Sequence, residues 1–127
     1  MTNIVLIALV ALGGALGAVG RHYVNIVAIE KLGTHFPYGI LIVNSLGGFF
    51  ILFFMTYFID RLSIDPMWKL FVVTGFLGGF TTFSSFTYDT VMMLHDREFL
   101  KAFLNFFLNN LLAFVSGALG FVLARSI

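Results

Sequence analysis

The sequence predicts an all-α integral membrane protein with four transmembrane helices. Of its 127 residues, 60% are hydrophobic and only 10% are charged, whereas about 25% of the residues in a soluble domain are charged. The charged residues leave four uncharged runs, at 1–20, 36–59, 70–88 and 102–124. Each run has about the 20 residues that a helix needs to cross a bilayer. We therefore predict a single membrane domain, 1–127, with spans at approximately 3–29, 37–60, 67–94 and 99–125.

Several functional classes are disfavoured by composition. The chain has no cysteine, which excludes disulfides and thiolate metal sites, and its three histidines all lie outside the uncharged runs. No nucleophile has a base within its span, so we do not expect an enzyme. The net charge of +1 and the lack of a basic cluster argue against nucleic acid as a partner. Run 1–20 has no basic residue at its start and precedes further apolar runs, which favours a first span over a cleaved signal peptide.

The basic residues between the runs do not choose an orientation. Three would lie on the side of the N-terminus and three on the other, or four if Arg21 reaches that side. Two interpretations stay open. Either a weak bias is resolved during insertion, or the chain inserts both ways and pairs with itself as an antiparallel, dual-topology homodimer. Small residues four apart, such as Gly13 with Gly17 and Gly75 with Gly79, would allow helices to approach closely.

Polar residues inside the first two predicted spans each have two interpretations. Arg21 follows a glycine-rich run and either extends to the lipid headgroups or anchors a polar vestibule. Asn44 lies near the middle of its span and either joins two helices or donates hydrogen bonds along a solute pathway. The sequence alone leaves both pairs of alternatives open.

The fourth span carries a polar stripe, and the interior of every run lacks an acidic residue. Asn105 and Asn109 lie four apart and therefore share a helix face, which continues roughly to Ser116. Asp89 directly follows the third run. Proton-coupled exporters usually place a carboxylate at mid-membrane, and run 1–20 has none, which disfavours a small multidrug-type exporter. Amides and hydroxyls instead suit a small anion or a neutral solute.

The third run departs from apolar patterning at GFLGGFTTFSSFTYD, residues 75–89. Gly78 and Gly79 favour a break in the helix near its middle. A break exposes backbone groups that protein or water must satisfy, and unwound carbonyls at mid-membrane can ligate Na⁺. Hydroxyl groups such as those of Thr82 and Ser84 either satisfy the break or merely bond to the preceding turn.

Two phenylalanines follow this break. Phe83 and Phe86 are three apart and share a face if helix resumes there. The edge of a phenyl ring is positive, so inward-facing edges would attract an anion weakly. A lipid-facing or packed pair is the alternative in a chain with 17 phenylalanines.

The string GFLGGFTTFSSF resembles the third-span signature of the Fluc family of fluoride channels. The VN of LIVNSLGG and the pattern of 14–21 ending in Arg21 also match that family. The resemblance covers the whole chain in length, number of spans and order of motifs. It implies antiparallel dual-topology homodimers in the cell inner membrane, with two fluoride pores along the subunit interface and passive export of fluoride from the cytoplasm.

The resemblance also implies roles for individual residues. Phe83 and Phe86 would line each pore edge-on, with Asn44 as the pore asparagine and Arg21 in a vestibule or near its mouth. The backbone carbonyls of Gly78 and Thr81 would hold a structural Na⁺ at the dimer centre. Thr82 and Ser84 would supply hydroxyl donors. No organic cofactor is expected.

Two positions depart from the family pattern, at the ends of the expected pore. Many members have Thr where this chain has Ile40, and often Ser or Thr where it has Ala113. Asn109, one turn earlier, is expected on the polar track instead. The exporter and a non-transporting assembly subunit remain the competing hypotheses.

Overall fold

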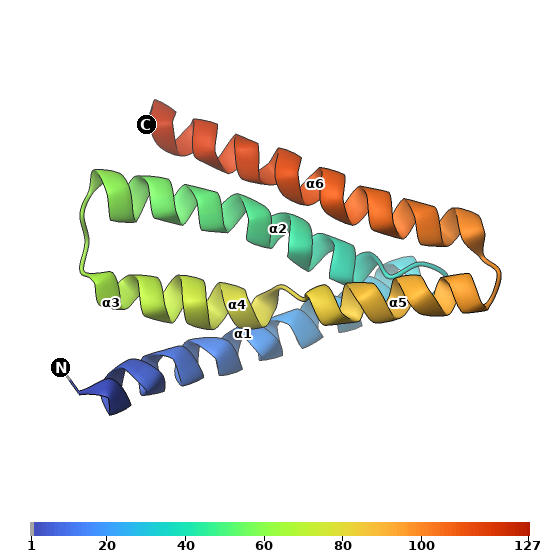
Figure 1. Cartoon of the computed structure of the whole chain (residues 1–127), viewed down its shortest axis with the longest axis horizontal. Coiled ribbons are helices and arrows are strands. Elements are labelled where there is room, and N and C mark those ends of the chain that lie inside the picture. Colours follow the sequence, from blue (N-terminus) through green and yellow to red (C-terminus); the bar gives the residue numbers. More distant parts are fainter. Residues whose placement is uncertain (1) are drawn as a thin grey trace.

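The computed structural model describes residues 2–127, and its main features are four long helical stretches joined by short turns (Figure 1). The described residues contain no β-strand. Each stretch is long and apolar enough to cross a membrane: Asn3–Leu32, Tyr38–Arg61, Pro66–His95 and Phe99–Ser126. The predictions of an all-α chain and of four membrane-spanning helices are therefore confirmed.

The four stretches differ in regularity. The first and last are single helices, α1 (Asn3–Leu32) and α6 (Phe99–Ser126). The second is α2 (Tyr38–Phe54), which continues as the π-helical segment η1 (Met55–Arg61). The third comprises α3 (Pro66–Lys69), the π-helical segment η2 (Leu70–Leu77), α4 (Gly78–Phe80) and α5 (Phe83–His95). Between α4 and α5, Thr81 and Thr82 have extended dihedral angles, and we call these two residues the extended pair.

The turns between stretches have local sequence causes. Gly33 ends α1 at φ 85°, a left-handed conformation that glycine adopts without strain. Asp65 begins α3 because its Oδ1 accepts a hydrogen bond from the Met67 N–H at 2.9 Å and because proline suits the first helical position that follows. The two termini and the turn between η1 and α3 all lie at the same end of the molecule (Figure 1).

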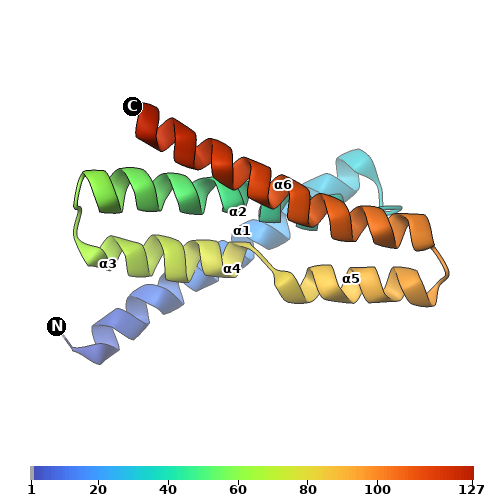
Figure 2. The ribbon, with the colours of Figure 1, turned by 45° about the horizontal axis from the view of Figure 1, so that its top comes forward.

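The third stretch packs on different neighbours along its length. α2 packs along α6, while α1 packs against α2, η2 and α4. The second view shows α5 displaced sideways from α4 at the extended pair, alongside the first half of α6 (Figure 2). The extended pair therefore lies where the neighbour of the third stretch changes from α1 to α6.

Glycines bring the helix backbones into close contact. A Cβ atom added to Gly17 would overlap the Phe76 carbonyl, and one added to Gly79 would overlap the Gly14 carbonyl. The seam between α2 and α6 is similar, because a Cβ on Gly120 would overlap the carbonyl of Phe49. The predicted close approach of small residues thus occurs between helices of the same chain.

Many large apolar side chains face outward. Ile4 and Phe114 are each 78% exposed, and many other leucine, valine and phenylalanine side chains are also exposed. Such a surface would be unstable in water, but it suits the hydrocarbon of a bilayer. The chain is a multi-pass membrane protein.

Candidate functional site

The extended pair, Thr81 and Thr82, is held by the amide side chain of Asn44. The Asn44 Oδ1 accepts a hydrogen bond from the Thr82 N–H at 2.9 Å, and its Nδ2 donates to the Thr82 carbonyl at 3.1 Å. These two bonds satisfy the backbone of Thr82 as a neighbouring β-strand would. Gly47, one turn further along α2, leaves room for the Thr81 methyl group, which a Cβ there would overlap.

Two backbone carbonyls lose their usual helical partners at the extended pair. In a continuous helix the Thr82 N–H would donate to the carbonyl of Gly78, but here it donates to Asn44. The Ser85 N–H would likewise donate to Thr81, but it donates to the Thr82 hydroxyl at 3.0 Å, which caps α5. The carbonyls of Gly78 and Thr81 are thereby released from the helical pattern.

Arg21 uses one of the released carbonyls. Its Nη1 donates to the Thr81 oxygen at 3.2 Å, which brings a cation from α1 to the centre of the third stretch. A carbonyl oxygen has two lone pairs, so Thr81 retains the capacity to bind a second partner. The Arg21 side chain is therefore bound to the third stretch. The alternative in which it extends to the lipid headgroups does not describe this contact.

The Asn44 side chain is also hydrogen-bonded to the polar stripe of α6. Its Nδ2 also donates to Asn109 Oδ1 at 3.0 Å. Asn109 Nδ2 donates to both the backbone and the side-chain oxygen of Asn105, each at 2.9 Å. Asn105 Nδ2 then donates to the Thr90 hydroxyl on α5 at 2.9 Å. We refer to Asn44, Asn109, Asn105 and Thr90 as the amide chain.

Most of the predicted site residues surround one cavity of about 260 Å³, which we call the site cavity. Its lining comprises Asn44, Thr81, Thr82, Phe83, Phe86, Asn109, Asn110, Ala113 and Phe114. The rings of Phe83 and Phe86 are tilted by 57° with centroids 5.5 Å apart. Phe86 is buried, whereas Phe83 is 79% exposed in the single chain. The cavity therefore opens toward the outer surface of the chain.

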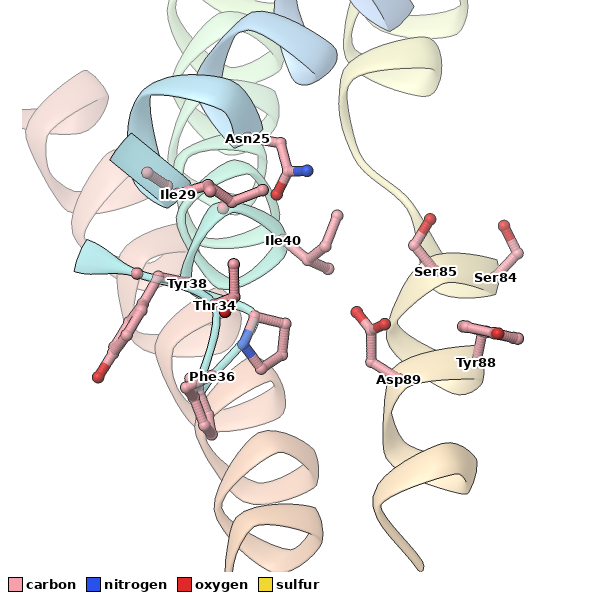
Figure 3. Close-up of a pocket in the computed structure, with 14 residues that line it drawn as sticks. Asn25, Ile29, Thr34, Phe36, Tyr38, Ile40, Ser84, Ser85, Tyr88 and Asp89 are labelled. Carbon is pink, nitrogen blue, oxygen red and sulfur yellow. The ribbon is translucent and has the colours of Figure 1, made fainter. Parts of the chain in front are cut away.

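A second cavity, of about 510 Å³, lies between α5 and the turn after α1, and we call it the loop-side cavity. Asn25 and Ile40 lie across it from Ser84, Ser85 and Asp89 of α5 (Figure 3). The Ser84 hydroxyl lies 3.2 Å from that of Thr82, so these two hydroxyl groups connect the linings of the two cavities. Ser84 is thus the one predicted hydroxyl donor that lies outside the site cavity.

The two departures from the family pattern occupy different places. Ile40 is buried and gives the loop-side cavity an apolar wall. Ala113 lines the site cavity, and its backbone carbonyl is so close to Gly48 that a Cβ there would overlap it. Asn109, one turn before Ala113, supplies the amide of α6 at this cavity.

Charged side chains do not form a metal site among residues 2–127, where no three His, Cys, Asp or Glu side chains converge. The same residues include no buried side-chain nitrogen or oxygen without a hydrogen-bond partner. A cation at this site would therefore depend on backbone carbonyls, and the released oxygens of Gly78 and Thr81 have the right chemistry, because hard cations prefer oxygen ligands.

Sequence reasoning placed Asn105 and Asn109 on one face but did not find Thr90. Thr90 follows the predicted third run, and a threonine hydroxyl within a helix commonly bonds to the preceding turn. It does so, donating to the Phe86 carbonyl at 2.8 Å, and it also accepts from Asn105. The second contact joins two spans, and the local pattern contains no signal for it.

Comparisons with known proteins agree with the resemblance seen in the sequence. Residues 8–121 match the family model described as "CrcB-like protein, Camphor Resistance (CrcB)". A relative from Sulfurihydrogenibium sp., "Fluoride-specific ion channel FluC", is 46% identical over 116 residues, which are 91% of this chain and 94% of the relative. Relatives of the same name from Aquifex aeolicus and Pyrococcus horikoshii are 42% and 40% identical, over 93% and 97% of this chain and 95% and 98% of their own length.

These relatives are named as channels and not as enzymes, in agreement with the expectation from the residues. The matches extend over nearly the entire chain and include all four helical stretches. The chain belongs to the CrcB-like protein family.

Proposed function

We propose that this protein is a fluoride-selective ion channel that lets fluoride leave the cytoplasm passively across the inner membrane. The relatives carry that activity in their names, and the four membrane-spanning helices provide the setting. The observation that carries the proposal for this chain is the site cavity, where a phenylalanine pair stands beside hydroxyl and amide groups without any carboxylate. Such a wall can attract an anion without trapping it.

The donors available to fluoride are chiefly hydroxyls. Both hydrogens of Asn44 Nδ2 have partners, at Thr82 and Asn109, and Asn109 Nδ2 is directed at Asn105. Thr82 and Ser84 share a single hydrogen bond between their hydroxyls, which leaves one hydroxyl hydrogen free to donate. We propose that this free hydroxyl hydrogen and the positive edges of Phe83 and Phe86 replace part of the hydration shell of fluoride, while the amides position the wall.

We further propose that a second copy, inserted in the opposite orientation, completes two such pores. Phe83 and Phe114 line the site cavity and are 79% and 78% exposed in one chain, so the pore wall is open on one side. An antiparallel partner would close it, and the balanced basic residues permit both orientations. The two pores would then run along the dimer interface.

Na⁺ is proposed at the dimer centre, held by the carbonyls of Gly78 and Thr81. The support is their release from helical hydrogen bonds at the extended pair. The space beside Gly78 is open as well, because a Cβ there would meet only the Val73 carbonyl, at 3.7 Å. We interpret the extended pair as the functional break of the third span, with Asn44 and the Thr82 hydroxyl satisfying the backbone that the break leaves without helical partners.

The deciding experiment measures ion efflux from liposomes that contain the purified protein, with fluoride and chloride electrodes in parallel. We expect fast fluoride loss with little chloride loss. Efflux that depends on an imposed proton gradient would instead support the exporter hypothesis. The absence of any flux from a folded dimer would contradict the channel and favour an assembly subunit.

A further inference from the structure

We infer that Asn105 and Thr90 are positioning residues, which set the direction of the hydrogen bonds behind the site cavity and so hold Asn44 on the extended pair. Neither residue lines the site cavity. Asn105 is 0% exposed and is joined to the cavity wall through its hydrogen bond with Asn109. The inference rests on the proposed channel function, but the hydrogen-bond arrangement can be tested separately.

The direction of every bond in the amide chain follows from its two ends. At one end the Thr82 N–H can only donate, so Asn44 must present its oxygen there and its Nδ2 to Asn109. Asn109 must then present its oxygen to Asn44 and its Nδ2 to Asn105. At the other end the Phe86 carbonyl can only accept, so the Thr90 hydroxyl donates to it and accepts from Asn105. No amide in this chain can turn around without losing a bond.

This one-way chain joins three of the four helical stretches at the site. It begins at the extended pair, passes through α2 and α6, and ends on α5 at the carbonyl of Phe86, whose ring lines the site cavity. Removing the Thr90 acceptor leaves a buried Asn105 amide without its partner, which is costly where no water can replace it. Asn105 and Asn109 can then rotate, and the bond that holds Asn44 toward α6 is lost.

Thr87 provides a matched control on the same helix. Its hydroxyl donates to the Phe83 carbonyl at 2.9 Å, as that of Thr90 donates to Phe86, but no amide side chain donates to Thr87 among the hydrogen bonds of residues 2–127. Thr90→Val and Thr87→Val therefore remove the same kind of bond to the carbonyl of a pore phenylalanine. Only Thr90→Val also removes the acceptor of Asn105.

The experiment compares fluoride efflux from liposomes for the wild type, Thr90→Val, Thr90→Ser and Thr87→Val, each verified as a folded dimer by size-exclusion chromatography. We expect Thr90→Val to lower fluoride efflux about tenfold, because of the unpaired buried amide. Thr90→Ser should rescue it, and Thr87→Val should match the wild type. Equal efflux in Thr90→Val and Thr87→Val would overturn the inference. If Thr90→Val does not fold, Thr90→Cys replaces it, since a thiol is a weak acceptor, and wild-type efflux in that variant would likewise overturn it.

A second measurement does not depend on fluoride. The side-chain amide signals of Asn44 and Asn109, recorded by ¹H–¹⁵N NMR in detergent, should shift in Thr90→Val and stay in place in Thr87→Val. Unchanged signals in Thr90→Val would show that Thr90 does not influence the hydrogen bonds of Asn44 and Asn109, and would overturn the inference. Shifted signals in a protein whose wild type conducts no fluoride would contradict the proposed function while supporting the positioning role.

Discussion

The first half of the third helical stretch packs against α1 through glycines, whereas the extended pair and α5 meet α2 and α6 through amides and hydroxyls. In the glycine seam, Gly13 and Gly17 of α1 lie so close to η2 that a Cβ on either would overlap a backbone carbonyl. The second region, which we call the polar site, comprises the extended pair and the amide chain. Its contacts are hydrogen bonds, and Asn105 and Asn109 are buried.

The contrast shows how structure and function are divided within one membrane segment. Lipid is as apolar as leucine, so helices in a bilayer associate through close packing and hydrogen bonds and not through the hydrophobic effect. The glycine seam supplies close packing without direction. The polar site supplies bonds with fixed direction, which are suited to placing donors beside an ion. Damage to the seam should therefore affect folding, and damage to the site should affect flux.

The largest effect is expected from a bulky residue in the glycine seam. Gly17→Val would place side-chain atoms inside the Phe76 backbone, and overpacking of this kind costs about 1 to 3 kcal/mol or more. We expect loss of the folded protein, measured by size-exclusion chromatography after extraction in detergent. Gly14→Ala is the matched control on the same helix, because its Cβ would meet only the Gly75 carbonyl, at 3.8 Å. A folded, active Gly17→Val protein would contradict the structural role of the seam.

The next effect is expected at the anchor of the polar site. Asn44→Leu removes three hydrogen bonds, two to Thr82 and one to Asn109. Bonds of this kind contribute about 0.6 to 1.7 kcal/mol each within membranes, so we expect lower thermal stability and no measurable fluoride efflux. Ser45→Ala is its neighbour and control, since among residues 2–127 that hydroxyl bonds only to the Leu41 carbonyl of its own helix. Wild-type efflux in Asn44→Leu would exclude Asn44 from the pore wall.

The sequence predicted the four helices and most of the residues that line the site cavity, but not how they are connected. Uncharged runs of sufficient length specify helices because lipid permits no other backbone arrangement for such segments. The motif around Phe83 and the lone Asn44 marked the site for a similar reason, since polar groups in lipid are costly.

Long-range contacts were not predictable in the same way. The pairing of Asn105 with Thr90 joins residues 15 apart across a turn, and the contact of Arg21 with Thr81 joins residues 60 apart. Neither leaves a periodic pattern in the chain. The spacing of Gly13 and Gly17 predicted a close approach, and only the fold showed that η2 of the same chain is their partner.

Substitution of Phe83 or Phe86 is expected to affect folding less than the two preceding changes, but to abolish fluoride efflux. Phe83→Ile keeps an apolar side chain at an exposed position, so the proposed dimer should persist, while the positive ring edge is lost. Phe86→Ile should add some loss of stability because Phe86 is buried. Fluoride efflux should be abolished in both. Phe103→Ile is the control, because Phe103 is also exposed but stacks on Phe107, and neither ring lines the site cavity. Normal efflux in both site variants would refute the edge-on role.

The smallest expected effect tests whether the extended pair also serves a cation. If the Gly78 and Thr81 carbonyls hold Na⁺ only in the folded dimer, replacing Na⁺ with choline should lower the melting temperature. Na⁺ at 100 times its Kd stabilises a folded state by about 2.7 kcal/mol. Each kcal/mol shifts the melting temperature of a protein the size of the proposed dimer by roughly 2 to 4 °C. An identical melting temperature in Na⁺ and choline would contradict the cation site.

Arg21 sharpens this last test, because its guanidinium already donates to the Thr81 carbonyl. Two cations that share one oxygen repel each other, so Arg21→Met should increase the stabilisation by Na⁺ even as it removes a hydrogen bond. Thr81→Val removes only the hydroxyl, which donates to Leu77, and leaves the carbonyl in place, so its response to Na⁺ should equal that of the wild type. A response to Na⁺ that Arg21→Met leaves unchanged would mean that the cation binds away from Thr81, and the carbonyls released by the extended pair would then need another explanation.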